Sequence, residues 1–391
     1  MYRMEFSANR LLVQVVPRLQ PARCGVSDQA ILLAGELKAA FGVETAFIVL
    51  NSTEPCSVPF PVAHCAPSEL LHACMLVNGD RPGSILVHLS GYGYSADGAP
   101  AHLASALDIV RTSGRFRVAV YFHELFASGM PWQSAFWYSR RQQRPVRRIA
   151  EGCDLQVTNT CHHAQWLERE SFKHSDTPVL LLPVFSAAGE TLKPVASTDR
   201  VPAIAVFGLA ATRRRAYKAM AGSACMLRDL GIEEILDIGL EFDAPGELSG
   251  IPVKRVGALT TEALGNLLAR TMFGFVQHPS TDLAKSSVFA SYCAQGTIPV
   301  LASPFSDQVD GLKDGVHLVS PRTAAVVRSS GLERCSTEAW RWYSAHAIRV
   351  HAATYAKWLE QSHMGEDRSV LLPPKQEKDE RGLRLVEEEG P

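Results

Sequence analysis

The chain has 391 residues, more than one ordinary domain holds and a comfortable length for two. Its 39 Lys and Arg residues balance 40 Asp and Glu residues, so there is no bulk positive charge to favour a nucleic-acid partner. Hydrophobic residues make up 46% of the sequence, yet no apolar run approaches the roughly 20 residues of a membrane span.

The start of the sequence, Met1 to Phe6, lacks the basic and apolar regions of a signal peptide, so we expect a cytoplasmic protein. The nine cysteines are scattered and include no Cys-x-x-Cys pair, which argues against zinc sites and disulfide frameworks. Cys161, His162 and His163 resemble metal ligands, but adjacent residues of one element point in different directions. We therefore interpret them as packing and surface residues, and we expect no metal site.

Short apolar runs alternate with helical patterns along the first half of the chain. The predicted strands are Leu11–Val16, Thr45–Leu50, Ile85–Leu89, Val118–Phe122 and Leu155–Val157, and the clearest predicted helices are Ser27–Ala40 and Ala101–Thr112. Alternation of this kind indicates a parallel sheet covered by helices on both faces.

A polar segment that contains prolines, at 189–202, interrupts the alternation and is predicted to be a linker. Beyond it we predict strands at Ala203–Phe207, Ile235–Ile238, Met272–Gln277 and Ile298–Leu301, and helices at Arg213–Leu230, Thr261–Ala269 and Ser286–Gln295. A long helix is predicted over about Thr337–Gln361. We therefore expect an N-terminal domain at 1–188, a C-terminal domain at 203–362 and a charged, mobile tail at 363–391.

Two doubly wound domains in one chain imply a cleft, because ligands bind beyond the carboxyl ends of parallel strands. Polar, glycine-rich and ionisable residues follow the predicted strands, as a binding cleft requires. They are Gly25, Ser27 and Asp28 after the first strand, Tyr92 and Tyr94 after the third, His123 and Glu124 after the fourth, and the segments 208–215 and 278–287 in the second half.

Four cations gather where the helix after Gly208 is expected to begin. Thr212 would cap this helix, while Arg213, Arg214, Arg215 and Lys218 would oppose its dipole. The arrangement suits an anionic ligand held between the cations, and it equally suits a solvated basic first turn. Both interpretations stay open on these residues alone.

The segment from Pro279 to Ser287 gathers phosphate-binding groups at the start of another helix. Free backbone amides would meet the hydroxyls of Ser286 and Ser287 and the ammonium of Lys285. The alternative is a plain serine cap beside a surface lysine. The dinucleotide fingerprint Gly-x-Gly-x-x-Gly is missing after the first strand, and so is a P-loop, which disfavours the usual NAD and ATP enzymes.

In order and spacing, the motifs resemble the bacterial glycosyltransferases of the GT-B fold, in particular the large family 4 of retaining enzymes. The resemblance covers most of the chain and rests on five segments. They are Pro17 to Glu36 with its Gly25-Val-Ser27-Asp28 turn, Phe122-His123-Glu124, Phe207-Gly208 with Arg214, His278-Pro-Ser280 continuing to Ala294-Gln-Gly296-Thr-Ile-Pro299-Val, and Asp310-Gly311-Leu-Lys-Asp314-Gly315.

The resemblance implies an α/β fold of two Rossmann-like, doubly wound domains facing each other across a cleft, with a long C-terminal helix. It implies a retaining, metal-independent transfer of a hexosyl group, without a cofactor, from a UDP- or GDP-linked donor to a glycan or lipid-linked acceptor, as in polysaccharide assembly. The donor would contact Gly208, Arg213, Arg214, Lys218, Lys285, Ser286, Ser287 and Ser291. Gly25, Ser27, Asp28, Tyr92 and Tyr94 would lie on the acceptor side, with His123 and Glu124 as catalytic residues.

His123 would hydrogen-bond a hydroxyl of the donor sugar from the N-terminal domain. The alternative is a buried structural histidine at a strand end. For an isolated histidine we would favour that alternative, but the position of His123 at the carboxyl end of a strand favours the binding role.

The chain departs from the family at two glutamates that are separated by seven residues. Aligned on Gly296 and Pro299, their positions hold Leu283 and Ser291, and the family's Gly-Phe-Gly phosphate turn becomes Ala284-Lys285-Ser286. In the family, the first glutamate contacts the donor sugar and the second the nucleotide ribose. Their loss motivates the alternative of a catalytically silent GT-B protein that binds a nucleotide or a protein partner.

Aromatic residues at 132–138 run into a basic stretch in which five arginines would share one helical face. They are Arg140, Arg141, Arg144, Arg147 and Arg148. Together with the aromatics, this face suits a peripheral contact with anionic lipid at the inner membrane. We favour the alternative of a solvated arginine face with the aromatics packed into the domain, because Pro145 would break the helix and Trp and Phe usually pack.

Overall fold

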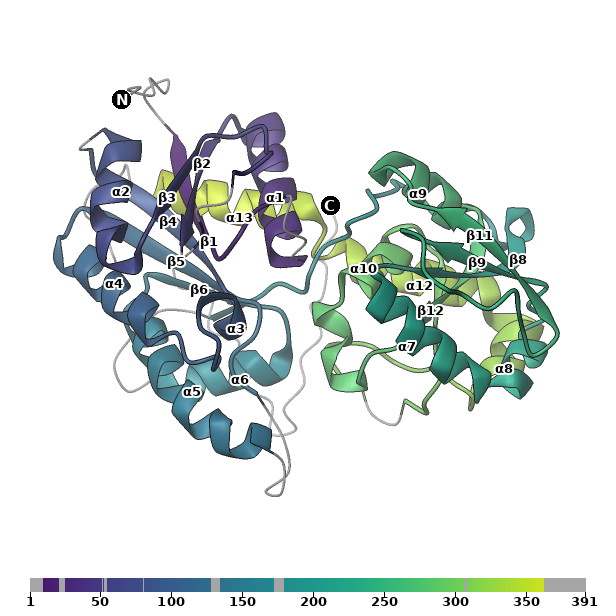
Figure 1. Cartoon of the computed structure of the whole chain (residues 1–391). Coiled ribbons are helices and arrows are strands. Elements are labelled where there is room, and N and C mark those ends of the chain that lie inside the picture. Colours follow the sequence, from purple (N-terminus) through teal and green to yellow (C-terminus); the bar gives the residue numbers. More distant parts are fainter. Residues whose placement is uncertain are drawn as a thin grey trace, which may run out of the picture.

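The computed structural model of the chain describes residues 10–20, 25–50, 52, 55–79, 81–127, 134–171, 179–305 and 308–361. It confirms two α/β domains, each built around a largely parallel sheet (Figure 1). The predicted tail at 363–391 and the aromatic residue Trp132 lie outside the described residues.

The N-terminal domain has a seven-stranded parallel sheet in the order β3-β2-β1-β4-β5-β6-β7. The strands are β1 (Leu11–Val16), β2 (Glu44–Leu50), β3 (Val62–Cys65), β4 (Gly83–Leu89), β5 (Phe116–Phe122), β6 (Leu155–Thr158) and β7 (Val179–Leu181). The five predicted strands are confirmed, because continuous apolar runs are what a sheet buried on both faces requires. The short edge strands β3 and β7 were not predicted, since they are half-buried and their apolar pattern is weak.

Helices cover both faces of this sheet (Figure 1). On one face lies α1 (Gly25–Phe41), and on the other lie α2 (Leu70–Asn78), α4 (Ala101–Thr112), α5 (Ser134–Glu151) and α6 (Cys161–Ser171). A one-turn helix, α3 (Gly91–Tyr94), follows β4, and a 3-10 turn at Pro67–Glu69 precedes α2.

The C-terminal domain has a six-stranded sheet in the order β10-β11-β9-β8-β12-β13, in which the short β10 pairs antiparallel. The strands are β8 (Val201–Phe207), β9 (Glu234–Ile238), β10 (Glu247–Leu248), β11 (Ile251–Gly257), β12 (Thr271–Val276) and β13 (Ile298–Leu301). The four predicted strands are confirmed. β11 was not predicted, because most of its residues are exposed or half-buried and they include Pro252, Lys254 and Arg255.

The helices of this domain follow the prediction with two interruptions. The single helix expected at 213–230 is divided at Gly222-Ser223 into two, and the C-terminal helical segment is divided again at 345–347. The helices are α7 (Ala210–Ala221), α8 (Ala224–Asp229), α9 (Thr261–Ala269), α10 (Ser287–Ala294), α11 (Ala324–Val326), α12 (Leu332–Ser344) and α13 (Ile348–Glu360), with 3-10 turns at Ser197–Asp199 and Ser280–Lys285 and a π-helical turn at Val327–Gly331.

The C-terminal helical segment returns to the N-terminal domain. α12 packs against α10 in the C-terminal domain, whereas α13 packs against α1 in the N-terminal domain (Figure 1). Arg117 Nη1 on β5 donates to the Trp358 carbonyl at 3.1 Å, and its guanidinium lies 4.7 Å from the Trp358 ring centre. The N-terminal domain is therefore completed by the last described helix of the chain.

Candidate active site

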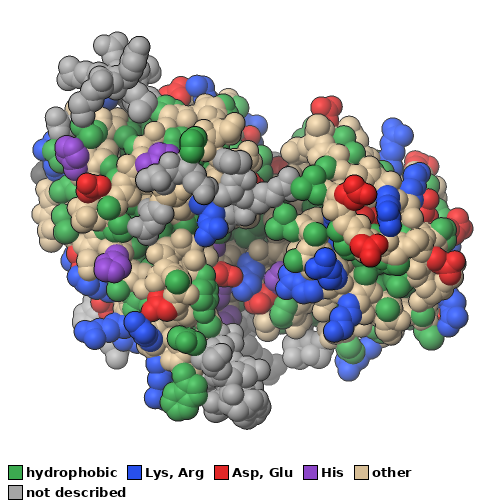
Figure 2. Space-filling view, viewed as in Figure 1, with side chains coloured by type: hydrophobic (Ala, Val, Ile, Leu, Met, Phe, Trp, Pro, Cys, Tyr) green, Lys and Arg blue, Asp and Glu red, His purple; other side chains and the backbone are tan. Residues whose placement is uncertain are grey.

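The carboxyl ends of the central strands of both sheets meet at a groove between the domains. Figure 2 shows this groove with basic, acidic and histidine side chains on its walls. The N-terminal wall carries His123 and Glu124, which follow β5, and the C-terminal wall carries His278, which follows β12. The pKa of His278 is lowered mainly by burial, and the charge of Glu124 acts on it in the opposite sense across the groove.

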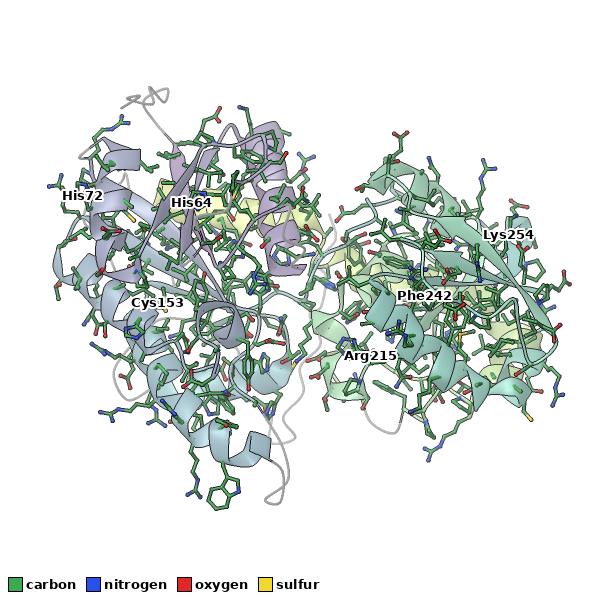
Figure 3. All side chains as sticks on the ribbon, viewed as in Figure 1. His64, His72, Cys153, Arg215, Phe242 and Lys254 are labelled. Carbon is green, nitrogen blue, oxygen red and sulfur yellow. The ribbon has the colours of Figure 1, made fainter. Side chains whose placement is uncertain are left out.

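A pocket in the C-terminal wall contains three of the eight predicted donor contacts, together with a hydroxyl and a cation from α7. Lys285, Ser286 and Ser287 line one side of it, and Thr212 and Arg215 on α7 line the other. In Figure 3, Arg215 lies on the part of this domain nearer the N-terminal domain, and Lys254 lies on the far side. The pocket thus combines two cations, three hydroxyls and the start of α10, which is a suitable environment for an anion.

The side of the pocket formed by Lys285 and Ser286 also makes local contacts within its own segment. The Ser286 hydroxyl accepts from the Phe289 amide at 3.3 Å and caps α10, and Lys285 Nζ lies 3.3 Å from Asp282 Oδ2. Both contacts are those expected from the alternative interpretation of this segment, a plain serine cap beside a surface lysine. They do not remove these groups from the pocket, because Lys285 remains 20% exposed and all three residues line the cavity.

The basic turn after β8 is arranged differently from the prediction. α7 begins at Ala210, and its N-cap residue Leu209 makes no side-chain cap bond, so the expectation that Thr212 caps this helix is wrong. Starting the helix earlier places Thr212 in the first turn and rotates the arginines that follow. Arg215 consequently lines the pocket, whereas Arg214 and Lys218 are exposed and do not belong to its described lining.

Arg213 is fully buried and cannot touch a ligand directly. Its Nη1 lies 2.6 Å from Asp237 Oδ2, its Nε donates to the Gly208 carbonyl at 3.1 Å, and its Nη2 donates to the Leu240 carbonyl. Gly208 has a φ of 127°, a conformation that a residue with a side chain adopts only with strain. Arg213 therefore fixes the turn that leads into the pocket.

The two positions of the family glutamates are both inside the protein. Leu283 has no exposed surface. The Ser291 hydroxyl donates to the Ser287 carbonyl at 2.7 Å and accepts from the Ala187 amide at 3.0 Å, which joins α10 to the chain segment between the domains. Ser291 does not line the pocket. The structure thus gives it a packing contact in place of the donor contact expected from the sequence.

His123 is buried at the end of β5, with 6% of its surface exposed. Its Nε2 lies 3.0 Å from His88 Nδ1, and its ring packs at 4.2 Å between centres on Tyr121. Burial, with added repulsion from His88 and His351, lowers the pKa of His123 well below its usual value, so the ring is neutral at physiological pH. Next to it, Glu124 is exposed and accepts from the Ser90 hydroxyl at 3.2 Å.

The predicted acceptor-side residues divide into exposed and structural ones. Tyr92 is 52% exposed and its hydroxyl accepts from Gln142 Nε2 at 3.1 Å, and Gly25 is exposed at the start of α1. Asp28 accepts from Gln20 Nε2 at 3.3 Å. Ser27 is buried and donates to the Arg18 carbonyl, and buried Tyr94 donates to the carbonyls of Val15 and His88. The last two therefore hold the loops and do not face a ligand.

Acidic and histidine groups that the sequence analysis did not assign to the site also meet near the groove. The Cys161 amide at the start of α6 donates to Asp310 Oδ1 at 2.6 Å, which joins the two domains. Asp310 has a φ of 51°, its Oδ2 is buried without a described partner, and burial raises its pKa. Burial and the charge of Lys285 lower the pKa of His163 to about 4.

No group of three or more potential metal ligands occurs among the residues that the structure describes.

Helix α5 contradicts the two premises on which the favoured alternative for the arginine face rested. It continues through Pro145, so the expected break is wrong; buried Val146 and Ile149 anchor the helix beyond the proline. The aromatics do not all pack inward, since Trp137 is 66% and Tyr138 is 47% exposed. Three of the arginines pair with acids, as the contacts Arg141–Asp97, Arg147–Glu170 and Arg148–Asp108 show.

Neither a protein-family model nor a curated protein sequence matches the chain, but solved structures do. The pneumococcal O-GlcNAc transferase GtfA, in complex with UDP and GlcNAc, superposes with a TM-score of 0.60 at 10% identity, over 92% of this chain and 100% of that one. A trehalose-6-phosphate synthase from E. coli, bound with UDP-2-fluoro glucose, gives 0.54 at 13% identity, over 90% and 99%. A Listeria monocytogenes protein described as a UDP-N-acetylglucosamine 2-epimerase gives 0.57 at 8% identity, over 92% and 98%.

At such low identities the likeness is informative about the fold. The chain has the GT-B fold, with two doubly wound domains and a helical C-terminus, as the sequence motifs led us to expect. No helix in the described ranges is long and apolar enough to cross a membrane. What the pocket binds has to be argued from its own groups.

Proposed function

We propose that the chain is a retaining glycosyltransferase similar to family 4, which moves a hexosyl group from a UDP- or GDP-linked sugar to a glycan or lipid-linked acceptor. The observation that carries this proposal is the pocket of Arg215, Lys285 and the α10 start, whose lining residue His278 is acted on across the groove by the charge of Glu124. The solved structures with the same fold support it, since two of those named above contain UDP or a UDP-sugar.

In the proposed reaction, the bond between the anomeric carbon and the diphosphate oxygen breaks while the acceptor hydroxyl approaches the same face of the sugar. Negative charge then develops on the leaving diphosphate. Arg215, Lys285 and the amides at the start of α10 stabilise this charge, as fixed donors in a partly desolvated site do. The leaving phosphate accepts the proton of the acceptor hydroxyl, so the proposal needs no separate protein base.

These two cations would also take over the charge neutralisation that a divalent metal provides in other transferases. We therefore propose a metal-independent reaction that uses no cofactor. In the absence of the family glutamates, the carboxylates of Asp282 and Asp310 are the acidic groups near the pocket that could bind hydroxyls of the donor. The charge of Asp282 acts on both Asp310 and His163, which indicates that these groups share one environment.

The experiment is a donor panel. The full chain is incubated with UDP-, GDP- and ADP-sugars, with and without a metal chelator, and released nucleotide diphosphate is measured together with the anomeric configuration of the product. We expect release from a UDP- or GDP-sugar, unchanged by the chelator, with retained configuration. Inverted product would contradict the retaining mechanism, and chelator-sensitive release would contradict metal independence.

A catalytically silent protein is the second candidate, and the burial of Leu283 and Ser291 favours it. Such a protein would bind UDP or GDP in calorimetry without releasing nucleotide diphosphate from any sugar in the panel. The proposal also includes a cytoplasmic location and a role in polysaccharide assembly. Both follow from a glycan or lipid-linked acceptor.

A further inference from the structure

Three buried polar side chains form a hydrogen-bonded row that ends at His123. Gln14 comes from β1 and His88 from β4, and the sheet order places β4 between β1 and β5. Gln14 is 0% and His88 1% exposed. Gln14 Oε1 lies 2.7 Å from His88 Nε2, and His88 Nδ1 lies 3.0 Å from His123 Nε2. The row therefore runs from the sheet interior to the carboxyl end of β5, where His123 lies.

The residues around this row are apolar, which makes its polar members costly unless they are hydrogen-bonded. Strand β1 otherwise consists of Leu and Val, and β4 contains Ile, Leu and Val around His88. The two imidazoles have hydrogen-bond partners in the row, whereas Gln14 Nε2 is buried without a described partner, so burial of these polar groups costs stability. Apolar residues of similar size would fill the same space without this cost, so packing alone does not account for the row.

The order of donors and acceptors along the row follows from its first member. An amide oxygen can only accept, so the hydrogen on the Gln14 side belongs to His88 Nε2. His88 is neutral, because burial, with repulsion from His351, lowers its pKa to about 3. Its Nδ1 therefore has a lone pair and accepts from His123 Nε2. In the neutral ring of His123, this leaves Nδ1 without a hydrogen.

We propose that Gln14 and His88 are positioning residues that hold His123 in one tautomer, with Nε2 protonated and Nδ1 free to accept a hydrogen bond from a substrate hydroxyl. An imidazole without these partners would exchange between two tautomers and would present a donor part of the time. The ring is confined, since it is buried and Tyr121 packs on it at 4.2 Å between ring centres. The identity of the hydroxyl as that of a sugar rests on the proposed function.

The tautomer can be measured directly by long-range proton–nitrogen NMR on the full chain with 15N-labelled histidine. The chain has 13 histidines, so the His123 signals are assigned by their loss in His123→Ala. We expect a protonated Nε2 and an unprotonated Nδ1 for His123. In Gln14→Leu, which removes the acceptor and keeps the volume, we expect the His123 signals to show a mixture of tautomers.

The matched control is Gln156→Leu. Gln156 is also fully buried in this sheet, on β6, and its side chain donates to the Ala150 carbonyl at 3.0 Å with no contact to the row. Both variants lose one buried amide. We expect Gln14→Leu to lower kcat about tenfold or more while the KM for the donor stays within about twofold, because a wrong tautomer affects the reaction more than ground-state binding. Gln156→Leu should leave kcat unchanged.

Two outcomes would overturn the inference. One is a wild-type spectrum with a proton on His123 Nδ1, which corresponds to the opposite orientation of the Gln14 amide. The other is an unchanged kcat in Gln14→Leu when His123→Ala is strongly impaired, which would leave the proposed function standing. If the chain transfers no sugar, the proposed function fails, and the spectrum of the wild-type protein still decides the tautomer.

Discussion

At the residue scale, neighbouring arginines provide an internal test of the pocket. Arg215 lines it, and Arg214 is exposed next to it without belonging to its described lining. We expect Arg215→Ala and Lys285→Ala each to weaken UDP or GDP binding by about 1.5–3 kcal/mol, because each removes a charge-assisted hydrogen bond. Calorimetry measures the change. Arg214→Ala is the control, and an equal loss in that variant would mean that bulk charge, and not the pocket, attracts the nucleotide.

His123 tests whether the N-terminal wall takes part in the reaction or only in binding. The hydrogen bond that a sugar hydroxyl donates to His123 would strengthen as the sugar ring flattens in the transition state. Its loss would therefore affect turnover more than donor affinity. We therefore expect His123→Ala to lower kcat by about 10²-fold with little change in the dissociation constant for nucleotide diphosphate. A melting curve for the variant accompanies the kinetics. A normal transfer rate in a folded variant would make His123 a structural residue.

At the scale of the element, the turn between β8 and α7 depends on Arg213. Removing one partner of a buried ion pair leaves the other charge unpaired, and Asp237 is 4% exposed. We expect Arg213→Ala to lower the free energy of unfolding by about 3–5 kcal/mol. Urea unfolding measures it, with exposed Arg214→Ala as the neighbouring control at about 0.5 kcal/mol or less. Similar stability of the two variants would contradict the role given to Arg213.

Helix α5 presents exposed aromatics together with exposed basic residues at its N-terminal end. Trp137, Tyr138, Arg140 and Arg144 are exposed there, and we propose them as the peripheral membrane contact that the arginine face suggested. We expect the protein to co-sediment with vesicles of anionic lipid at low salt and to dissociate as salt rises. Arg140→Gln with Arg144→Gln should weaken this binding. Arg147→Gln with Arg148→Gln removes the same charge at the other end of the helix, away from the exposed aromatics, and an equal effect there would contradict the assignment.

At the scale of the whole molecule, buried histidines make stability depend on pH. Burial is the main cause that lowers the pKa of His88 and His346 to about 3, and of His163 and His351 to about 4. In the unfolded chain these side chains titrate near 6.5, as free histidines do. Below that pH the unfolded state therefore binds more protons than the folded state, and stability falls as pH falls.

We expect this part of the stability to be fully present above about pH 7 and to decline from about pH 6.5 towards pH 4, by up to about 1.4 kcal/mol per pH unit for each histidine. Urea unfolding at several pH values measures the slope. A free energy of unfolding that stays level between pH 7 and pH 5 would show that these histidines are not buried as described.

The sequence predicted the architecture well because both central sheets are built from continuous apolar runs. It failed where structure depends on neighbours distant in the chain. Which of three consecutive arginines faces the pocket depends on the start of α7 at Ala210, which no cap residue marks. His88 lies within an apolar strand, and only the pairing of β4 with β5 places it beside His123. Asp310 meets the start of α6 from a position 149 residues away.

The return of α13 to the N-terminal domain has a consequence for synthesis on the ribosome. When the strands of the N-terminal domain have emerged from the ribosome, about 170 codons remain to be translated before α13, which packs on α1, has been made. At roughly 5–20 residues per second, translation takes roughly 10–35 seconds to supply it. During that interval the apolar surface of α1 that later contacts α13 is open to chaperones or to other nascent chains. Cutting the gene between the two sheets would leave that surface permanently uncovered.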